Sequence, residues 1–113
     1  MVSMPTVQQI YSLQKPVPEH IEPFYLGWAV GVIEGEGSFD RREIKVTQKD
    51  RALLDRLVDV LGGRVTTQGP KYFQWYITGS NMEKVVHLIY SHLTERRQAQ
   101  VRKMRGILVS NEK

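Results

Sequence analysis

The apolar positions of the chain predict the order helix, two strands, helix, two strands and then helices. A dense apolar run over 24–33 predicts the first helix, and Pro23 suits its first turn. A short strand around 38–40 and a turn follow, and 43–48 then alternates apolar with polar residues, as a half-buried strand does. Leucines and valines at helical spacing predict the next helix over 51–61.

The second half of the chain begins with a predicted hairpin. Segments 64–68 and 71–78 are the two strands, and the chain turns between them near Gly69 and Pro70. In the second strand, residues of alternating character predict one core face and one exposed face. The core set is Phe73, Trp75 and Ile77, and the exposed set is Tyr72, Gln74, Tyr76 and Thr78.

Polar residues at the predicted helix ends agree with these boundaries. Asp50 is a candidate N-cap of the helix over 51–61, and two glycines follow that helix. Ser80 and Glu83 form a candidate capping box for a helix that reaches about Leu93. A basic helix is expected over 95–109, with an inward-packing set of Ala99, Met104, Ile107 and Leu108.

This element order predicts an α+β fold, with a four-stranded antiparallel sheet covered by helices on one face only. The 113 residues suit one domain, over 23–113. Before it, 1–22 holds three prolines and little periodicity, so we expect an extended or partly disordered N-terminal arm.

The uncovered sheet face is predicted to be polar and mildly basic. Such a face suits a nucleic-acid groove, and a plain solvated sheet face is the alternative. The residues that the alternation places on it are Lys45, Thr47, Thr66, Gln68, Gln74 and Tyr76.

Composition narrows the classes of partner and compartment. The chain has no cysteine, which excludes disulfides and thiolate metal sites. The net charge of +4 favours a polyanionic partner. No run is long enough for a transmembrane helix, and the N-terminus lacks the pattern of a signal peptide. We therefore expect an intracellular protein, in the cytoplasm, nucleoid or an organelle matrix, that is not secreted and has no membrane partner.

The first helix combines three glycines with two carboxylates. Gly27, Gly31 and Gly35 recur every fourth residue, which lays them in one groove where another backbone can approach closely. Glu34 and Glu36 stand where the apolar run ends, and charges beside a buried contact are costly unless paired or metal-bound. We infer a helix that packs on a near twin. The alternative is an ordinary core helix that ends at a glycine-rich turn.

Three short segments resemble those of one enzyme family. Residues 29–37, AVGVIEGEG, resemble the LAGLIDADG signature of homing endonucleases, with glutamates in place of its two aspartates. Residues 46–49, VTQK, are similar to the family's strand end before the next helix. Residues 97–99, RQA, resemble the opening of its last helix. The one departure in charge is Glu95, which stands where the family often has a lysine.

The resemblance implies the αββαββα fold, with the open sheet as a saddle in the DNA major groove. Because the chain has one motif, it implies a homodimer through the motif helix and a near-palindromic double-stranded DNA target. The implied interface residues are Gly27, Trp28, Val30, Gly31, Glu34 and Gly35. The DNA-contacting set is expected among Arg41, Arg42, Lys45, Thr47, Lys49, Arg64, Thr66, Gln68, Lys71, Tyr72, Gln74 and Tyr76.

The resemblance also implies the chemistry. Glu36, with the carbonyl of Gly35, would bind Mg²⁺ or another divalent cation such as Mn²⁺ or Ca²⁺, since hard cations prefer oxygen ligands. Gln48 would position water near the scissile phosphate. Arg96 or Arg97 would stand in for the missing lysine, although arginine and lysine are not interchangeable.

The implied function is a site-specific DNA endonuclease of intron or intein mobility that makes a metal-dependent double-strand break. Glu95, and the short hairpin between Gly37 and Gln48, motivate an alternative, which is a non-cleaving DNA- or RNA-binding protein of maturase-like or regulatory type. A third hypothesis is an interaction domain whose glycine-grooved helix only dimerises.

Overall fold

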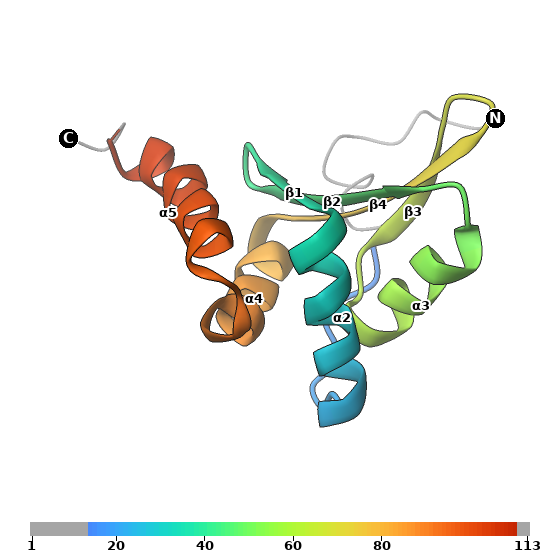
Figure 1. Cartoon of the computed structure of the whole chain (residues 1–113), viewed down its shortest axis with the longest axis horizontal. Helices are drawn as coiled ribbons and strands as arrows, with labels where there is room; N and C mark the ends of the chain where they lie inside the picture. Colours follow the sequence, from blue (N-terminus) through green and yellow to red (C-terminus); the bar gives the residue numbers. More distant parts are fainter. Residues whose placement is uncertain (1–13, 111–113) are drawn as a thin grey trace, which may run out of the picture.

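The structure is a computed structural model that describes the backbone of residues 14–110 and the side chains of residues 14–105. Helices and strands follow the predicted order (Figure 1). The elements are α2 (Pro23–Glu36), β1 (Gly37–Asp40), β2 (Glu43–Gln48), α3 (Arg51–Leu61), β3 (Arg64–Gln68), β4 (Tyr72–Thr78), α4 (Gly79–Ile89), the 3-10 turn η1 (Tyr90–His92) and α5 (Glu95–Ser110).

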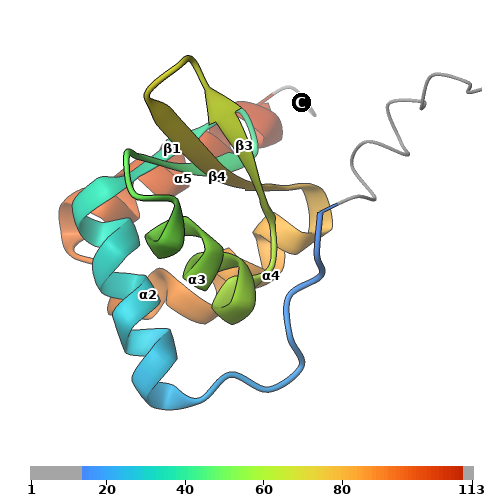
Figure 2. The same ribbon diagram turned by 90° about the vertical axis from the view of Figure 1, so that its right-hand side faces the viewer.

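The four strands form one antiparallel sheet in the order β1-β2-β4-β3. Helices α2, α3 and α4 cover one face of it, and α5 stands beside the β1 edge (Figures 1 and 2). The predicted α+β architecture, with a sheet covered on one face, is therefore confirmed.

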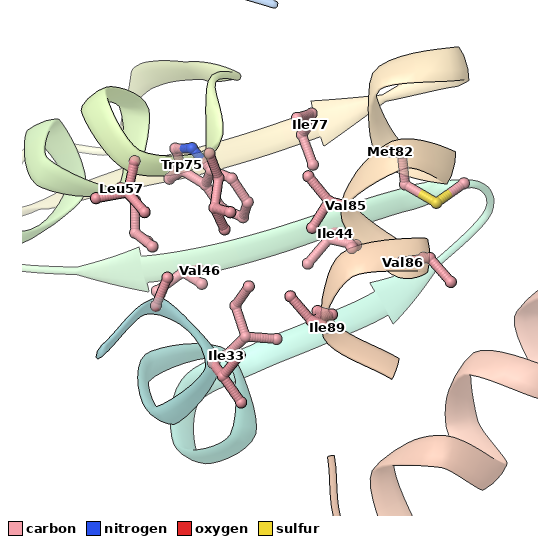
Figure 3. Packing of buried hydrophobic residues seen from close by; sticks show 14 of the residues in the cluster. Ile33, Ile44, Val46, Leu57, Trp75, Ile77, Met82, Val85, Val86 and Ile89 are labelled. Atoms are coloured by element: carbon pink, nitrogen blue, oxygen red, sulfur yellow. The ribbon is translucent and has the colours of Figure 1, made fainter. Parts of the chain in front are cut away.

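The core lies between the sheet and its helices. Trp75 of β4 is fully buried, and its indole Nε1–H donates to the carbonyl of Gly62 over 2.9 Å. Ile33 of α2 and Ile44 of β2 are also fully buried (Figure 3). These inward positions alternate along β2 and β4 as the sequence predicts. Consequently the residues between them point to the open face.

The ends of α3 form as the sequence predicts. The Asp50 carboxylate accepts from the N–H of Ala52 over 2.9 Å, which satisfies a donor that the first helical turn leaves free. At the other end, Gly62 and Gly63 have φ of 81° and 89°. A Cβ at Gly62 would lie 2.5 Å from the carbonyl oxygen of Pro16, so this turn requires glycine.

The predicted capping box of the next helix is wrong. Helix α4 begins at Gly79 after Thr78, so Ser80 lies inside the helix and caps nothing. The Glu83 carboxylate instead pairs with the guanidinium of Arg105 over 3.2 Å. The helix also ends at Ile89, earlier than predicted, because the chain tightens there into η1.

Helix α5 packs on the domain with a different set of residues than expected. Met104 is buried as predicted, and Val101 is buried with it. Ala99 is exposed, so its inward packing is not found within the chain. Ile107 and Leu108 lie outside the described side chains. The buried face of α5 therefore differs from the predicted one. This helix is polar and has no strong apolar period, so its contacts with the rest of the domain decide which residues are buried.

Part of the N-terminal arm docks on the domain. Figure 2 shows the described residues before α2 running past α3 to the end of β4. There the side-chain amide of Gln14 donates to Thr78 Oγ1 over 2.9 Å and accepts from the Thr78 N–H over 3.2 Å. The backbones of Lys15 and Gly63 also pair. Thr78 is therefore buried, and its predicted exposure is wrong, because Gln14 covers it. The arm residues 1–13 lie outside the described part.

Within the described residues, no helix combines the length and apolar character that crossing a bilayer requires.

Candidate functional site

Helix α2 has one buried face and one face of bare glycine. Ala29 and Ile33 are fully buried against the sheet. On the opposite side, Gly27, Gly31 and Gly35 are exposed, and a Cβ added to any of them would meet nothing within 4 Å. Three helix-weakening residues are thus aligned on a face that no other described part of the chain covers.

The apolar side chains that flank this glycine face differ in how much of their surface is exposed. Phe24 is 76% exposed, and Trp28 is half-buried with the guanidinium of Arg56 lying 5.5 Å from its ring centre. Val30, by contrast, is only 9% exposed and packs in the chain's own core. Of the apolar residues expected in an interface, Trp28 remains accessible and Val30 offers little surface.

Glu36 ends α2 and is exposed. The chain enters β1 immediately afterwards, and a Cβ at Gly37 would lie 2.5 Å from the Ile33 carbonyl oxygen, so this sharp exit requires glycine. Among the described residues, no group of three or more acidic, histidine or cysteine side chains lies close enough to hold a metal ion. The described part of one chain therefore does not by itself assemble three such ligands around Glu36.

The sheet register brings Gln48 toward the same end of the molecule. Gly37 is paired with Val46, so the rest of β2 continues past the start of β1 in the direction of Glu36. Gln48 is the last residue of β2 and is half-buried. Strand pairing, rather than nearness in the sequence, therefore sets where Gln48 lies relative to Glu36.

Glu34 fastens α2 to the start of α5. Its carboxylate accepts from the Thr94 N–H over 2.7 Å and from the Thr94 hydroxyl over 2.9 Å. These hydrogen bonds, led by the one from the Thr94 backbone, hold the pKa of the Glu34 carboxyl below its usual range, and the nearby guanidinium of Arg97 adds to the effect. Glu34 thus holds the end of α2 in place through Thr94.

Arg97 is buried beside this contact, with only 8% of its surface exposed. Its Nε–H donates to the Glu34 carbonyl over 2.9 Å, and Nη1 donates to Gln100 Oε1 over 2.7 Å. The guanidinium carbon lies 5.6 Å from the ring centre of Phe39 in β1. Arg97 therefore joins α2, α5 and β1, whereas Arg96 is exposed and lies near enough to Glu34 to act on its charge.

The open face of the sheet carries the predicted polar side chains. Lys45 and Thr47 of β2 lie opposite Tyr76 and Gln74 of β4, and the Gln74 amide donates to Thr47 Oγ1 over 3.3 Å. The register adds Arg64, Thr66 and Gln68 of β3 to the same face.

Two carboxylates share this face, and the sequence analysis did not select them. Asp40 and Glu43 are paired at the end of the β1–β2 hairpin, and Glu43 forms an ion pair with Lys45 over 3.0 Å. Both side chains point to the open face because they alternate with the inward residues of β1 and β2. Their inclusion lowers the net positive charge at this end of the face.

Cations also gather at the two hairpin turns. Arg41 and Arg42 form the β1–β2 turn with φ of 49° and 69°, a left-handed conformation that non-glycine residues adopt at a cost. Near the other hairpin, Lys49 Nζ lies 5.5 Å from the ring centre of Tyr72. Arg51, which the sequence analysis missed, lies equally close to the Phe73 ring, at 5.5 Å. Lys71 is exposed in the second turn.

Comparison with known proteins relates this geometry to solved structures. No family model matches the chain, and no curated protein matches it. The chain is similar to the crystal structure of the homing endonuclease I-TnaI, with 25% identity, a TM-score of 0.65, and coverage of 77% of this chain and 73% of that one. It is also similar to the archaeal intron-encoded homing endonuclease I-Vdi141I in complex with DNA, with 24% identity, a TM-score of 0.62, and coverage of 79% and 71%.

The chain has the LAGLIDADG homing endonuclease fold. A third neighbour, I-CvuI in complex with the I-CreI target and magnesium, with the DNA not cleaved, has 15% identity and a TM-score of 0.62. That likeness covers 70% of this chain and 62% of I-CvuI. The resemblance identified from three short segments is thereby confirmed.

One departure within this homing endonuclease fold is visible at the start of α5. The Glu95 carboxylate, where a lysine was expected, pairs with the guanidinium of Arg102 over 2.8 Å. Arg102 also donates to the hydroxyl of Tyr90 over 2.7 Å. The acidic group is thus neutralised within the exposed surface of α5, and no cation replaces the lysine at that position.

Proposed function

We propose that this chain is a site-specific DNA endonuclease that works as a homodimer and makes a metal-dependent double-strand break. The observation that carries the proposal is the bare glycine face of α2, which ends at the exposed carboxylate of Glu36 beside an open polar sheet. The solved neighbours in complex with DNA support the choice of substrate.

The homodimer follows from the uncovered face. Two copies of α2 that meet along Gly27, Gly31 and Gly35 would bring their backbones close, and the contact would be isologous. An isologous pair of sheets fits a near-palindromic duplex, with each open face on one half-site.

The oxygen ligands of two copies together fit a divalent cation better than the oxygen ligands of one copy. Glu36 and the Gly35 carbonyl offer oxygen ligands, which suit Mg²⁺, Mn²⁺ or Ca²⁺, and a second copy would double them at the dimer axis. When bound, such a cation lowers the pKa of water and stabilises a leaving oxygen. Gln48 would orient water, and Glu34 with Arg97 would hold the end of α2 in place.

The test compares the wild-type protein with Glu36→Gln on a randomised DNA library, with Mg²⁺ and with chelator. We expect wild type to cut a near-palindromic sequence only with metal, and Glu36→Gln to bind that sequence without cutting it. Glu19→Gln makes the same chemical change on the exposed N-terminal segment and should cut normally. Unaltered cutting by Glu36→Gln would refute the assigned site.

The charge at Glu95 favours one second candidate, a DNA- or RNA-binding protein on the same scaffold that does not cleave. It predicts salt-dependent binding without metal-dependent cutting of any sequence in the library. Glu95→Lys tests whether this charge is the cause: if Glu95 prevents cleavage, the variant should gain metal-dependent cutting that the wild type lacks.

A further inference from the structure

A cleft of about 390 Å³ lies between the edge strand β1 and helix α5, outside the site around Glu36. Residues of β1 form one wall, and residues of α5 form the other. Figure 1 shows α5 standing beside the β1 edge of the sheet. Among the described residues 14–110, strand β1 pairs only with β2, so the backbone groups on its other edge have no strand partner there. The lining residues are Gly37, Ser38, Phe39, Asp40, Arg41, Arg97, Gln100, Lys103 and Met104.

Three cations line this cleft against one carboxylate. Arg41, Arg97 and Lys103 are positive, and Asp40 is negative. Arg97 is the central one because it is buried and its position is fixed by Glu34 and Gln100 through Nε and Nη1. Among the described residues, its remaining nitrogen Nη2 has no hydrogen-bond partner. A guanidinium held this way presents a pre-oriented donor, which suits an oxyanion.

The cleft also reaches the open face of the sheet. Ser38 and Asp40 share a face with Lys45 and Glu43, whereas Phe39 is paired with the buried Ile44. Since residues from both faces of β1 line the cleft, it passes around the sheet edge. A group that enters from a duplex lying on the open face would meet the Ser38 hydroxyl and then the cations.

We propose that this β1–α5 cleft is a phosphate-binding site that takes a backbone phosphate of the bound DNA. This inference rests on the proposed function for the source of the phosphate. The site would fix the position of the duplex without reading bases, as phosphate contacts do in most protein–DNA complexes. The site adds Lys103, Ser38 and Arg97 to the proposed DNA-contacting residues. The sequence pattern of the open face predicts none of these three.

The first test measures DNA affinity against salt concentration for wild type, Lys103→Gln and Lys84→Gln. Lys103 is an exposed residue of α5, so its replacement should leave the fold intact. Lys84 is an exposed lysine of α4 that lines a different groove, beside Val17, and serves as the matched control. The salt slope falls by about 0.9 for each phosphate that the protein no longer neutralises, hence by about 1.8 for a dimer with two clefts.

We expect this reduction for Lys103→Gln and no change for Lys84→Gln. Equal slopes for wild type and Lys103→Gln would overturn DNA as the source of the phosphate. If the wild-type protein shows no salt-dependent DNA affinity, the proposed function is refuted. Failure of the proposed function can be told apart from failure of the phosphate site, because the second test needs no DNA.

The second test titrates inorganic phosphate into the protein and follows the backbone amide resonances of residues 38–41 by NMR. We expect saturable shifts that Lys103→Gln weakens at least threefold and Lys84→Gln leaves unchanged. Shifts with the same midpoint in all three proteins would show an unspecific ionic effect and overturn the site itself.

Discussion

At the scale of single residues, Glu34 and Glu36 have different environments although only one residue separates them. Glu34 is engaged by both donors of Thr94 and by the charge of Arg97, whereas Glu36 is exposed at the helix end. Helical geometry causes the difference, because residues two apart point about 200° from each other. One carboxylate therefore stabilises the fold and the other remains available for a ligand.

The lowered pKa of Glu34 predicts acid sensitivity of the fold. A carboxyl whose folded-state pKa lies below its unfolded value stabilises the protein above the unfolded pKa, and this stability is lost as pH falls through the folded pKa. We expect the melting temperature of wild type to fall below about pH 5 more steeply than that of Glu34→Gln. Thermal denaturation by circular dichroism from pH 7 to 3 checks this, and parallel curves would contradict the assignment.

At the scale of elements, α2 has one packed face and one face that the described chain leaves uncovered. Its glycines reduce helix propensity by about 1 kcal/mol each relative to alanine. Nothing within the described chain occupies the space they leave, whereas the opposite face of the helix is fully packed. Within the described chain, no packing contact therefore offsets this cost, which supports the proposed association of two copies along this face.

A bulky residue on the glycine face should prevent two copies from associating while each copy still folds. We expect Gly31→Leu to keep the far-UV circular dichroism of wild type, because a side chain there has open space, and to shift the protein from dimer to monomer. Sedimentation equilibrium measures the mass. Gly37→Ala is the contrasting variant, since its Cβ would clash with the Ile33 carbonyl, and it should lose folded structure itself. A Gly31→Leu protein that remains dimeric would rule out the glycine face as the interface.

At the scale of the whole molecule, contacts between distant segments fix the position of the sheet. Gln14 is joined to Thr78 across 64 residues, and Glu34 to Thr94 across 60. The first contact closes the β4 end of the sheet, and the second fixes α5 beside β1. One end of β4 and the α5 wall of the cleft are thus both held by long-range hydrogen bonds.

Removing the first of these contacts should destabilise the entire domain. Gln14→Ala leaves the buried N–H and hydroxyl of Thr78 without their partner, which costs about 1–3 kcal/mol of unfolding free energy. Lys15→Ala is the control, because Lys15 is exposed and contributes its backbone only, and it should change stability by less than about 0.5 kcal/mol. Urea denaturation measures both, and equal stabilities would show that the N-terminal segment is not integral to the fold.

The sequence by itself determined the order of the elements, the ends of α3 and the alternation that creates an open polar face. These features depend on local periodicity and on residues such as Asp50 and Gly62, whose conformations are set by near neighbours. It also located the glycine spacing and the acidic end of α2, since both lie within one short segment.

Only the tertiary structure decided which polar groups meet. Thr78 was expected to be exposed and is buried because Gln14 reaches it from the far end of the chain. Arg97 was expected to act as a catalytic residue. In the structure it is held between α2, α5 and β1 and lines a cleft that the sequence pattern does not predict. Strand register and helix docking bring such distant residues together, and neither is encoded by the spacing of residues along the chain.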